Sequence, residues 1–591
     1  MCGIIGYFGR KPAVPIVLDA LKRLEYRGYD SAGIASLSDG RLLIKKDVGK
    51  VDEVIQKQDL ASLPGNVAIG HTRWATHGGV TQSNAHPHSD CGGRVAVVHN
   101  GIIENNQQLR QELTRAGHRF SSETDTEVIP HLLEDELKNG HSLEQAVLNI
   151  APRLEGSYAF LVASPGAPDK IVGTRRNNPL ILGVDAADYY VSSDALAFSH
   201  YTNRVMNLED NEVVVLTQEG IEFFDAQGRK LVKQARKLDG GWAGSHKGGY
   251  QYFMLKEIME QAQVLGQAVR QDGKKFAEIA MDILRARQVI ITACGTSRYA
   301  ALVGRYLFSR VGKKFCDVVM ASEFGYFADS VDKSTVVIAV SQSGETADIL
   351  DGVKAARAAG AEVISIVNRP NSVLADLSHR IIYLNCGSEI AVAATKSFLS
   401  QLAIFYLLSF SMISSFDEAA TRLTALSLEL NKVLDWNKSE LIKLSQKLKD
   451  RNDFYYIARG INFAIASEGA LKLKEISYIH AEGMPAGELK HGTLALIEAG
   501  TPVVVICPGD YTFAETLSNA VEAKSRGAYI IAVSDRESDI YDSWIRLPEV
   551  DELLYPMLAV VPLQFLAYYL AINRGCDPDR PRNLAKSVTV K

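Results

Sequence analysis

The 591-residue chain lacks the features that mark disordered, nucleic-acid-binding and nucleotide-binding proteins. It has no Gly/Ser tract and no long run of one charge sign, so disorder is not expected. The net charge is −5, so no overall positive field attracts nucleic acid or an anionic membrane. Neither G-x-G-x-x-G nor G-x-x-x-x-G-K-[ST] occurs, which disfavours dinucleotides and nucleoside triphosphates.

The cysteines and the apolar stretches indicate a cytoplasmic protein without membrane spans. Seven cysteines lie scattered without C-x-x-C spacing, and this odd count favours a reducing compartment. The N-terminus MCGIIGYFGR has no basic residue before its apolar ones, so no signal peptide is expected. Residues 398–413 and 553–572 are apolar but interrupted by Gln or Pro, which favours buried helices.

The pattern of apolar residues changes along the chain and divides it into domains. Short strand-like runs with two helical patterns, at residues 13–24 and 127–138, predict an α+β domain over residues 2–226. A polar, glycine-rich linker is expected at residues 227–249. Strand and helix then alternate, and the strand–turn–helix order occurs twice. This repeat predicts two doubly wound α/β domains, residues 250–430 and 431–575, followed by a C-terminal tail, residues 576–591.

Cys2 follows the initiator Met and becomes the first residue if that Met is removed. Its α-amine, with an ordinary pKa of about 7.7–8.0, can then take the thiol proton as the sulfur attacks. A buried structural thiol is the alternative for an isolated Cys2. The polar segments HTRWATHG, VVHNGIIEN and SSETDTEV favour the nucleophile, because the first two follow predicted strands and the third follows a loop.

These three segments contain the groups needed to bind glutamine. Arg73 can hold an α-carboxylate through two hydrogen bonds, and Asp125 can hold an α-ammonium group. The Asn100 amide and the Gly101 backbone N–H can stabilise the oxyanion formed when a thiolate adds to an amide. Each residue alone has a structural explanation, such as an ion pair, a helix cap or an Asn-Gly turn. Their combination favours a glutamine site.

The histidines of this region raise the question of a metal site. No carboxylate or cysteine joins them at metal-ligand spacing, so hydrogen-bonded structural roles are favoured. No metal and no organic cofactor is expected. The histidines concerned are His71, His77, His86, His88 and His99.

The segments CGIIGYFG, YRGYDSAG, HTRWATHG, NAHPH, HNGIIEN and SETDTE resemble the class II glutamine amidotransferase domain, an N-terminal-nucleophile (Ntn) fold. The resemblance implies that Cys2 is the nucleophile, that Asn100 and Gly101 form the oxyanion hole, and that Trp74 gates an ammonia channel. The glutamine-binding residues that it implies are Arg73, Thr76, His77 and Asp125.

Hydroxyl-bearing turns predict a phosphate site in the second half. Ser341, Ser343 and Thr346 lie between a predicted strand and a helix, where helix N–H groups also face an anion. Thr296 and Ser297 repeat this arrangement. Helix capping explains either turn alone, whereas two such turns on adjacent strands favour phosphate.

A charged helix face is the second feature of this half. Glu468, Lys472 and Glu475 share one face of a predicted helix, for which an exposed row of ion pairs is the alternative.

The segments SQSGETAD, EIAVAATKSF, EGALKLKEISYIHAE, GELKHG and PRNLAKSVTV resemble the tandem sugar isomerase (SIS) domains of the glucosamine-6-phosphate synthase family. The resemblance implies that Lys586 forms a Schiff base with fructose 6-phosphate, Glu475 moves a proton from C1 to C2, and His491 assists ring opening. It also implies a homodimer in which His491 enters the neighbouring subunit's site. The sugar-phosphate residues expected are Thr296, Ser297, Ser341, Gln342, Ser343, Thr346, Val392, Lys472 and Ala585.

Three alternatives stay open. Departures from the family pattern near Arg298, Gly325 and Asn371 leave room for a different ketose phosphate. An amidotransferase acting on a ribosyl pyrophosphate or an amino acid is disfavoured by the tandem repeat. A non-catalytic sugar-phosphate sensor is disfavoured because the nucleophile and the Schiff-base lysine are both present.

Overall fold

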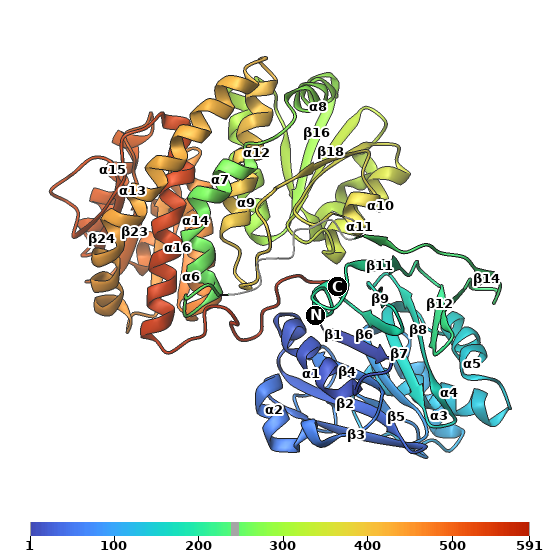
Figure 1. Cartoon of the computed structure of the whole chain (residues 1–591). Coiled ribbons are helices and arrows are strands. Elements are labelled where there is room, and N and C mark those ends of the chain that lie inside the picture. Colours follow the sequence, from blue (N-terminus) through green and yellow to red (C-terminus); the bar gives the residue numbers. More distant parts are fainter. Residues whose placement is uncertain (1, 238–246, 371, 590–591) are drawn as a thin grey trace. The chain divides into compact units, whose positions relative to one another are not determined.

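The computed structural model describes residues 2–237, 247–370 and 372–589 and divides into two compact units (Figure 1). The first unit is Met1–Ala243 with Ser587–Lys591, and the second is Gly244–Lys586. Within the range expected to be a linker, β14 (Lys230–Leu231) and β15 (Arg236–Lys237) pair with edge strands of the first unit. Residues 238–246 of that range, like Asn371, lie outside the described residues.

The first unit contains two antiparallel sheets that pack face to face between two layers of helices. The eight-stranded sheet has the order β15-β11-β9-β10-β1-β4-β2-β3, and the seven-stranded sheet has the order β14-β13-β12-β8-β7-β6-β5. The remaining strands are β1 (Gly3–Phe8), β2 (Ser31–Ser38), β3 (Arg41–Val48), β4 (Val67–Arg73), β5 (His88–Ser89), β6 (Ala96–Ile103), β7 (Gly156–Ser164), β8 (Ala167–Arg176), β9 (Ile181–Asp185), β10 (Asp188–Ser192), β11 (Arg204–Asn207), β12 (Val213–Thr217) and β13 (Gly220–Phe224).

Alternation along each strand separates the cores of this unit. In β1, Ile4 contributes to the core between the sheets, whereas Ile5 faces the core under helices α1 and α2. In β6, Val98 faces the other sheet and Val97 packs against α3, α4 and α5. The α+β organisation expected of this region is confirmed. The helices are α1 (Ala13–Leu24), α2 (Val51–Gln58), α3 (Asn106–Arg115), α4 (Val128–Lys138) and α5 (Leu143–Ile150).

The second unit contains the predicted repeat, two parallel five-stranded sheets with the same topology. The first has the order β17-β16-β18-β19-β20 and the second the order β22-β21-β23-β24-β25. Parallel strands need crossover connections. Most of these contain an α-helix or a 3₁₀ helix, whereas the described connection from β24 to β25 contains neither. The strands are β16 (Gln288–Ala293), β17 (Asp317–Met320), β18 (Thr335–Ser341), β19 (Glu362–Val367), β20 (Arg380–Tyr383), β21 (Asp453–Ala458), β22 (His480–Pro485), β23 (Pro502–Ile506), β24 (Tyr529–Ser534) and β25 (Ser543–Arg546).

Most helices of the second unit share one large apolar core between the two sheets, whereas α10 and α11 pack in a separate core on the first sheet and α15 in another on the second. Helix α13 runs across the boundary expected between residues 430 and 431. The helices are α6 (Phe253–Met259), α7 (Gln261–Ala268), α8 (Gly273–Arg285), α9 (Gly295–Arg310), α10 (Ala347–Ala358), α11 (Val373–Asp376), α12 (Lys396–Ser411), α13 (Phe416–Leu448), α14 (Asn462–Ser477), α15 (Phe513–Lys524) and α16 (Tyr555–Asn573).

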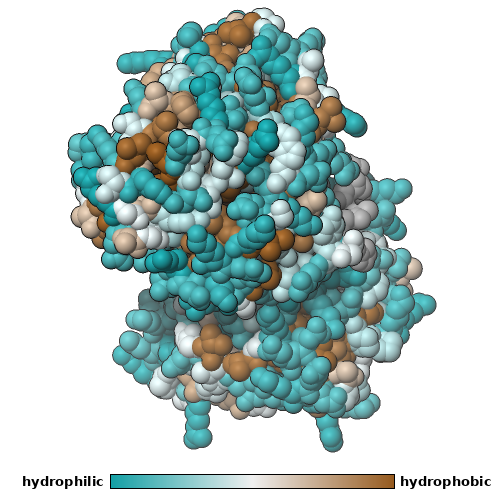
Figure 2. All heavy atoms as spheres, turned by 90° about the vertical axis from the view of Figure 1, so that its left-hand side faces the viewer, coloured by the Kyte–Doolittle hydropathy of each residue, from teal (hydrophilic) through white to brown (hydrophobic). Residues whose placement is uncertain are grey.

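The two long apolar stretches are core helices. Every residue of α12 is buried. The segment Glu552–Asn573, which contains α16, is long and apolar enough to cross a membrane, but 89% of its most apolar window is buried in the protein. That burial is typical of a core helix. On the face drawn in Figure 2, hydrophilic residues cover most of the surface and apolar ones form small patches.

Candidate active sites

Cys2 directly precedes β1, a central strand of the eight-stranded sheet. Gly3 pairs with Thr72 of β4, and this register brings Cys2 next to the end of β4. The backbone N–H of Trp74 donates to the Cys2 sulfur at 3.2 Å. Burial raises the pKa of the Cys2 thiol above its ordinary value. The thiol is therefore mostly protonated at neutral pH and needs a base before it can attack.

Arg73 is the last residue of β4, and its guanidinium organises the loop that follows. It donates to the carbonyl oxygens of His77, Gly78 and Gly79, so the loop closes around the side chain. Asp125 lies in a short 3₁₀ helix and accepts the backbone N–H of Ile103 at 2.8 Å. Burial lowers the pKa of Arg73, and the nearby charges of Cys2 and Asp125 act in the opposite direction. The structure thus brings Cys2, Arg73 and Asp125 together.

Asn100 and Gly101 lie side by side on β6. The Asn100 side-chain amide donates to the Cys2 carbonyl oxygen at 2.9 Å, so the predicted oxyanion donor is next to the predicted nucleophile. Gly101 has a φ of +125°, and a Cβ there would lie 1.9 Å from the Ser157 carbonyl oxygen. This position therefore requires glycine.

The other predicted residues of this region lie in the loop after β4 or between the two sheets. Trp74 and His77 are partly buried, and Thr76 is exposed. His71 contacts the His99 carbonyl oxygen at 2.9 Å through Nε2. Burial lowers the pKa of His71 to about 3, so its ring is neutral and acts as a hydrogen-bonding group.

The predicted phosphate turns adjoin at the ends of paired strands. Ala293 of β16 pairs with Val340 of β18, so the turns that follow both strands lie at the same sheet edge. The Ser341 hydroxyl lies 3.5 Å from that of Ser343 and 3.4 Å from that of Thr346, just before α10. Gln342 is partly buried within this turn. These hydroxyls and the N–H groups at the start of α10 form a cradle of hydrogen-bond donors for an anion.

Lys472 and its partners form a buried charged cluster, in contrast to the exposed alternative. Its ammonium lies 2.6 Å from Glu475 Oε2 and 3.5 Å from Glu468 Oε1, and it donates to the Thr296 hydroxyl at 3.0 Å. Burial alone lowers the pKa of Lys472, but the two carboxylates raise it above its ordinary value. Burial raises the pKa of Glu468 to about 8.

Lys586 forms an ion pair with Glu389, its Nζ lying 2.5 Å from Oε2. Glu389 also accepts the backbone N–H groups of Thr395 and Ser397 and the Ser397 hydroxyl. Burial raises the pKa of Glu389, but the Lys586 ammonium and these donors outweigh it and hold the pKa at about 2. A backbone hydrogen bond also joins the two segments that carry this pair: the N–H of Val392, three residues after Glu389, donates to the Asp579 carbonyl oxygen at 3.1 Å.

Family models match both halves of the chain. A glutamine amidotransferase domain matches residues 71–200, and the SIS domain matches residues 282–410 and 447–574. The glutamine--fructose-6-phosphate aminotransferase [isomerizing] of Pyrococcus horikoshii is 46% identical over 605 residues, covering 100% of both chains. The protein of the same name from Thermococcus kodakarensis is 46% identical with the same coverage.

The chain belongs to the glutamine--fructose-6-phosphate aminotransferase family. Among solved structures, the C-terminal domain of glucosamine-fructose-6-phosphate aminotransferase from Francisella tularensis is similar to this chain, with a TM-score of 0.53 and 33% identity. The match covers 57% of this chain and 100% of that domain. The expected fold, an α+β Ntn glutaminase domain followed by two doubly wound SIS domains, is confirmed.

Four further residues of this aminotransferase chain lie in or near the sugar half's clusters or were expected there. Glu389 was missed by the sequence analysis, although it lies in the EIAVAATKSF segment; an acidic residue among small apolar ones was the available signal. His491 is exposed at the end of a 3₁₀ helix, and in the described part of the chain no hydrogen bond or ion pair links it to Lys586 or Lys472. Ser297 accepts a hydrogen bond from Gln401 at 2.9 Å, and Ala585 is partly buried beside Lys586.

Proposed function

We propose that this chain is a cytoplasmic enzyme that makes glucosamine 6-phosphate and glutamate from fructose 6-phosphate and glutamine. The observation that carries the proposal is that one chain combines the Cys2 setting with the buried Lys586–Glu389 pair. The relatives named for this activity match over the full length, which supports the assignment of both halves.

In the glutaminase half, the α-amine of Cys2 takes the thiol proton after removal of Met1. The sulfur then attacks the amide carbon of glutamine, and the Asn100 amide with the Gly101 N–H stabilises the oxyanion. The tetrahedral intermediate collapses to a thioester and releases ammonia, and water hydrolyses the thioester to glutamate. Arg73 holds the substrate carboxylate and Asp125 its ammonium group.

Three further residues of this half have proposed roles. Thr76 and His77, in the loop closed by Arg73, line the glutamine site. Trp74 gates the route of the ammonia, which must stay out of water because protonation would make it non-nucleophilic.

In the sugar half, the hydroxyl cradle and the start of α10 bind the phosphate group. The Lys586 amine attacks C2 of the open-chain ketose, and water leaves as the imine forms. Because only a neutral amine attacks, Lys586 must first lose its proton to water. Glu389, whose pKa of about 2 makes it a weak base, holds the Lys586 side chain in place at 2.5 Å. Ammonia then replaces the Lys586 nitrogen at C2.

Glu475 completes the reaction by taking a proton from C1 and returning it to C2, which converts the ketose imine into the 2-amino aldose. The Lys472 ammonium lies 2.6 Å from Glu475 Oε2 and holds this carboxyl group in position.

His491 is proposed to act in the site of a second subunit of a homodimer. Its exposure at the end of a 3₁₀ helix supports this arrangement. Mixed dimers of His491→Ala and Lys586→Ala chains should recover part of the activity, since one of the two sites then contains both residues. Mixed dimers as inactive as either parent would contradict a shared site.

The main test is product stoichiometry. Purified protein given glutamine and fructose 6-phosphate should form glutamate and glucosamine 6-phosphate in equal amounts, with N-terminal mass showing Cys2 as the first residue. Other ketose phosphates in parallel reactions test the acceptor. Glutamate formed without amino sugar would reject fructose 6-phosphate as the acceptor.

A further inference from the structure

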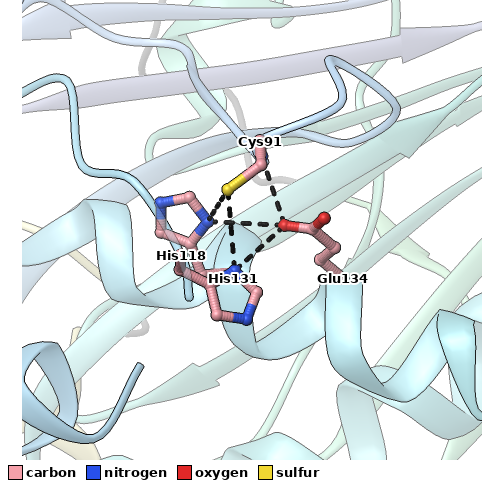
Figure 3. Close-up of side chains that lie close together, drawn as sticks. All are labelled: Cys91, His118, His131 and Glu134. Atoms are coloured by element: carbon pink, nitrogen blue, oxygen red, sulfur yellow. Dashed lines mark hydrogen bonds and ion pairs between the residues drawn. The ribbon is translucent and has the colours of Figure 1, made fainter. Parts of the chain in front are cut away.

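Four potential metal ligands from three segments converge in the first unit, away from the groups assigned to glutamine (Figure 3). Cys91 lies in the loop between β5 and β6, and His118 lies in the loop after α3. His131 and Glu134 are one helical turn apart on α4, so both side chains leave the same face. We propose that these four residues bind a structural Zn²⁺ ion.

The distances between the ligand atoms fit one tetrahedral ion. The Cys91 sulfur lies 3.7 Å from His118 Nδ1 and 3.6 Å from His131 Nδ1. Glu134 Oε2 lies 3.1 Å from His118 Nδ1 and 3.6 Å from His131 Nδ1, and all four atoms lie within 4.8 Å of one another. Tetrahedral zinc with bonds of about 2.0–2.3 Å separates its ligand atoms by about 3.3–3.6 Å. One ion can therefore be bound with small side-chain movements.

The surroundings orient the ligands as a metal site requires. The second ring nitrogen of His118 lies 2.9 Å from Asp135 Oδ1, so Nδ1 faces the cluster. Glu134 binds Lys138 through its other oxygen, Oε1, at 2.9 Å, which leaves Oε2 directed at the two rings. The side chains of His118, His131 and Glu134 are all buried, whereas Cys91 is exposed and provides a path for an ion.

A hydrogen-bonded cluster without metal is the alternative, and it satisfies these atoms less well. A thiol has one hydrogen, yet two ring nitrogens lie within 3.7 Å of the Cys91 sulfur. The backbone N–H of Arg119 also donates to this sulfur at 3.4 Å, and that of Cys91 donates to Glu134 Oε2 at 3.2 Å. Such donors suit a thiolate and a carboxylate that share a cation.

The ion would join segments that carry the glutamine pocket. The Cys91 loop leads into β6, which carries Asn100 and Gly101, and α4 directly follows the turn that contains Asp125. With four protein ligands the site is closed, so its role is structural. The expectation of no metal rested on a different set of histidines, from His71 to His99.

Metal content and cobalt spectroscopy on the full chain test the proposal. Elemental analysis should find one Zn²⁺ per chain. After chelation, Co²⁺ should restore the site and give thiolate-to-cobalt charge-transfer absorption. Cys91→Ser should abolish this absorption, whereas Cys2→Ala and Cys576→Ser should retain it. No charge-transfer band in the wild-type protein, or an undiminished band in Cys91→Ser, would overturn the proposal without relying on any variant's activity.

The orienting carboxylate allows a finer test that leaves all four ligands in place. Asp135→Asn should lower zinc affinity by about 10–100-fold in a competition titration with a chromophoric chelator. Glu136→Gln is the matched control, because Glu136 pairs with His141 outside the cluster. Equal zinc affinity of Asp135→Asn and wild type would contradict the assigned role of His118 as an oriented ligand.

Discussion

The two proposed reaction centres of this chain have opposite electrostatic surroundings. Around Cys2 the close partners are backbone groups, and the thiol is kept protonated by burial. Around Lys586 and Lys472 the partners are carboxylates, so charge is already separated before any substrate binds. Burying charges is costly unless they are paired. The first centre should therefore tolerate loss of its key residue structurally, whereas the second should not.

The largest expected effect is on activity at the first centre. Cys2→Ala should lower glutamine hydrolysis by about 10⁴-fold or more, because no other group replaces the nucleophile. Isomerisation of fructose 6-phosphate and thermal stability should change little. Glutamate release and sugar isomerisation are measured in parallel, with Cys576→Ser as the control. Loss of both activities in folded Cys2→Ala would contradict the prediction that the two centres act through separate residues.

The second expected effect is on stability. Lys586→Met removes the cation of a buried pair and should lower the free energy of unfolding by about 3–5 kcal/mol, measured by urea denaturation. Because the pKa of Glu389 is lower in the folded protein, its ionisation stabilises the fold fully at pH values above its pKa in the unfolded chain, about 4.3. This stabilisation is lost as the pH falls toward 2.

The matched double variant completes this test. Lys586→Met with Glu389→Gln should regain part of the loss, because no buried carboxylate then lacks a cation. If Lys586→Met is as stable as wild type, the ion pair does not carry the proposed energy.

A smaller effect is expected in the pH dependence of stability. The pKa of Glu468 is raised to about 8 in the folded protein. Its contribution to the free energy of unfolding is therefore full below its pKa in the unfolded chain, about 4.3, and is lost as the pH rises through 8. Glu468→Gln cannot ionise and should remove a slope of up to about 1.4 kcal/mol per pH unit between pH 5 and 8. Urea midpoints at several pH values measure this, with exposed Glu537→Gln as the control. An unchanged slope would contradict the raised pKa.

The smallest expected effect concerns the hydroxyl groups of the phosphate cradle. Ser343→Ala removes one hydroxyl from the phosphate cradle and should raise the KM for fructose 6-phosphate by about 2–10-fold, the range of one hydrogen bond. Glutamine hydrolysis and stability should stay near wild type. Ser322→Ala, an exposed serine in the same half, is the control. A KM unchanged by Ser343→Ala would place the phosphate elsewhere.

Local patterns predicted many helices and strands well. Residues 13–24 form α1, and the helix predicted at residues 127–138 is α4 (Val128–Lys138). The repeat was visible because both halves of the second unit need the same alternation of apolar strands and helices. The residues around Cys2 were predictable because they belong to the motifs HTRWATHG and VVHNGIIEN, which β4 and β6 carry in the two sheets of the Ntn fold.

Contacts between distant segments could not be predicted in this way. Glu468, Lys472 and Glu475 were placed on one helix face, but the pattern did not show that Glu468 and Lys472 are buried there against Thr296 of α9. Glu389 and Lys586 are 197 residues apart in the sequence and form an ion pair. From its polarity alone, the segment that contains Lys586 would be interpreted as a frayed C-terminal tail.

The sequence by itself determined the order of elements, the repeat and the identity of the candidate nucleophile, because these depend on local periodicity and on motif residues. Only the tertiary structure decided which charges are buried together. It paired Lys586 with Glu389, enclosed Lys472 between two carboxylates, and gathered Cys91 with two histidines and Glu134. Desolvation and pairing depend on side chains brought together from distant segments, so the pKa shifts that distinguish the two centres arise from the fold.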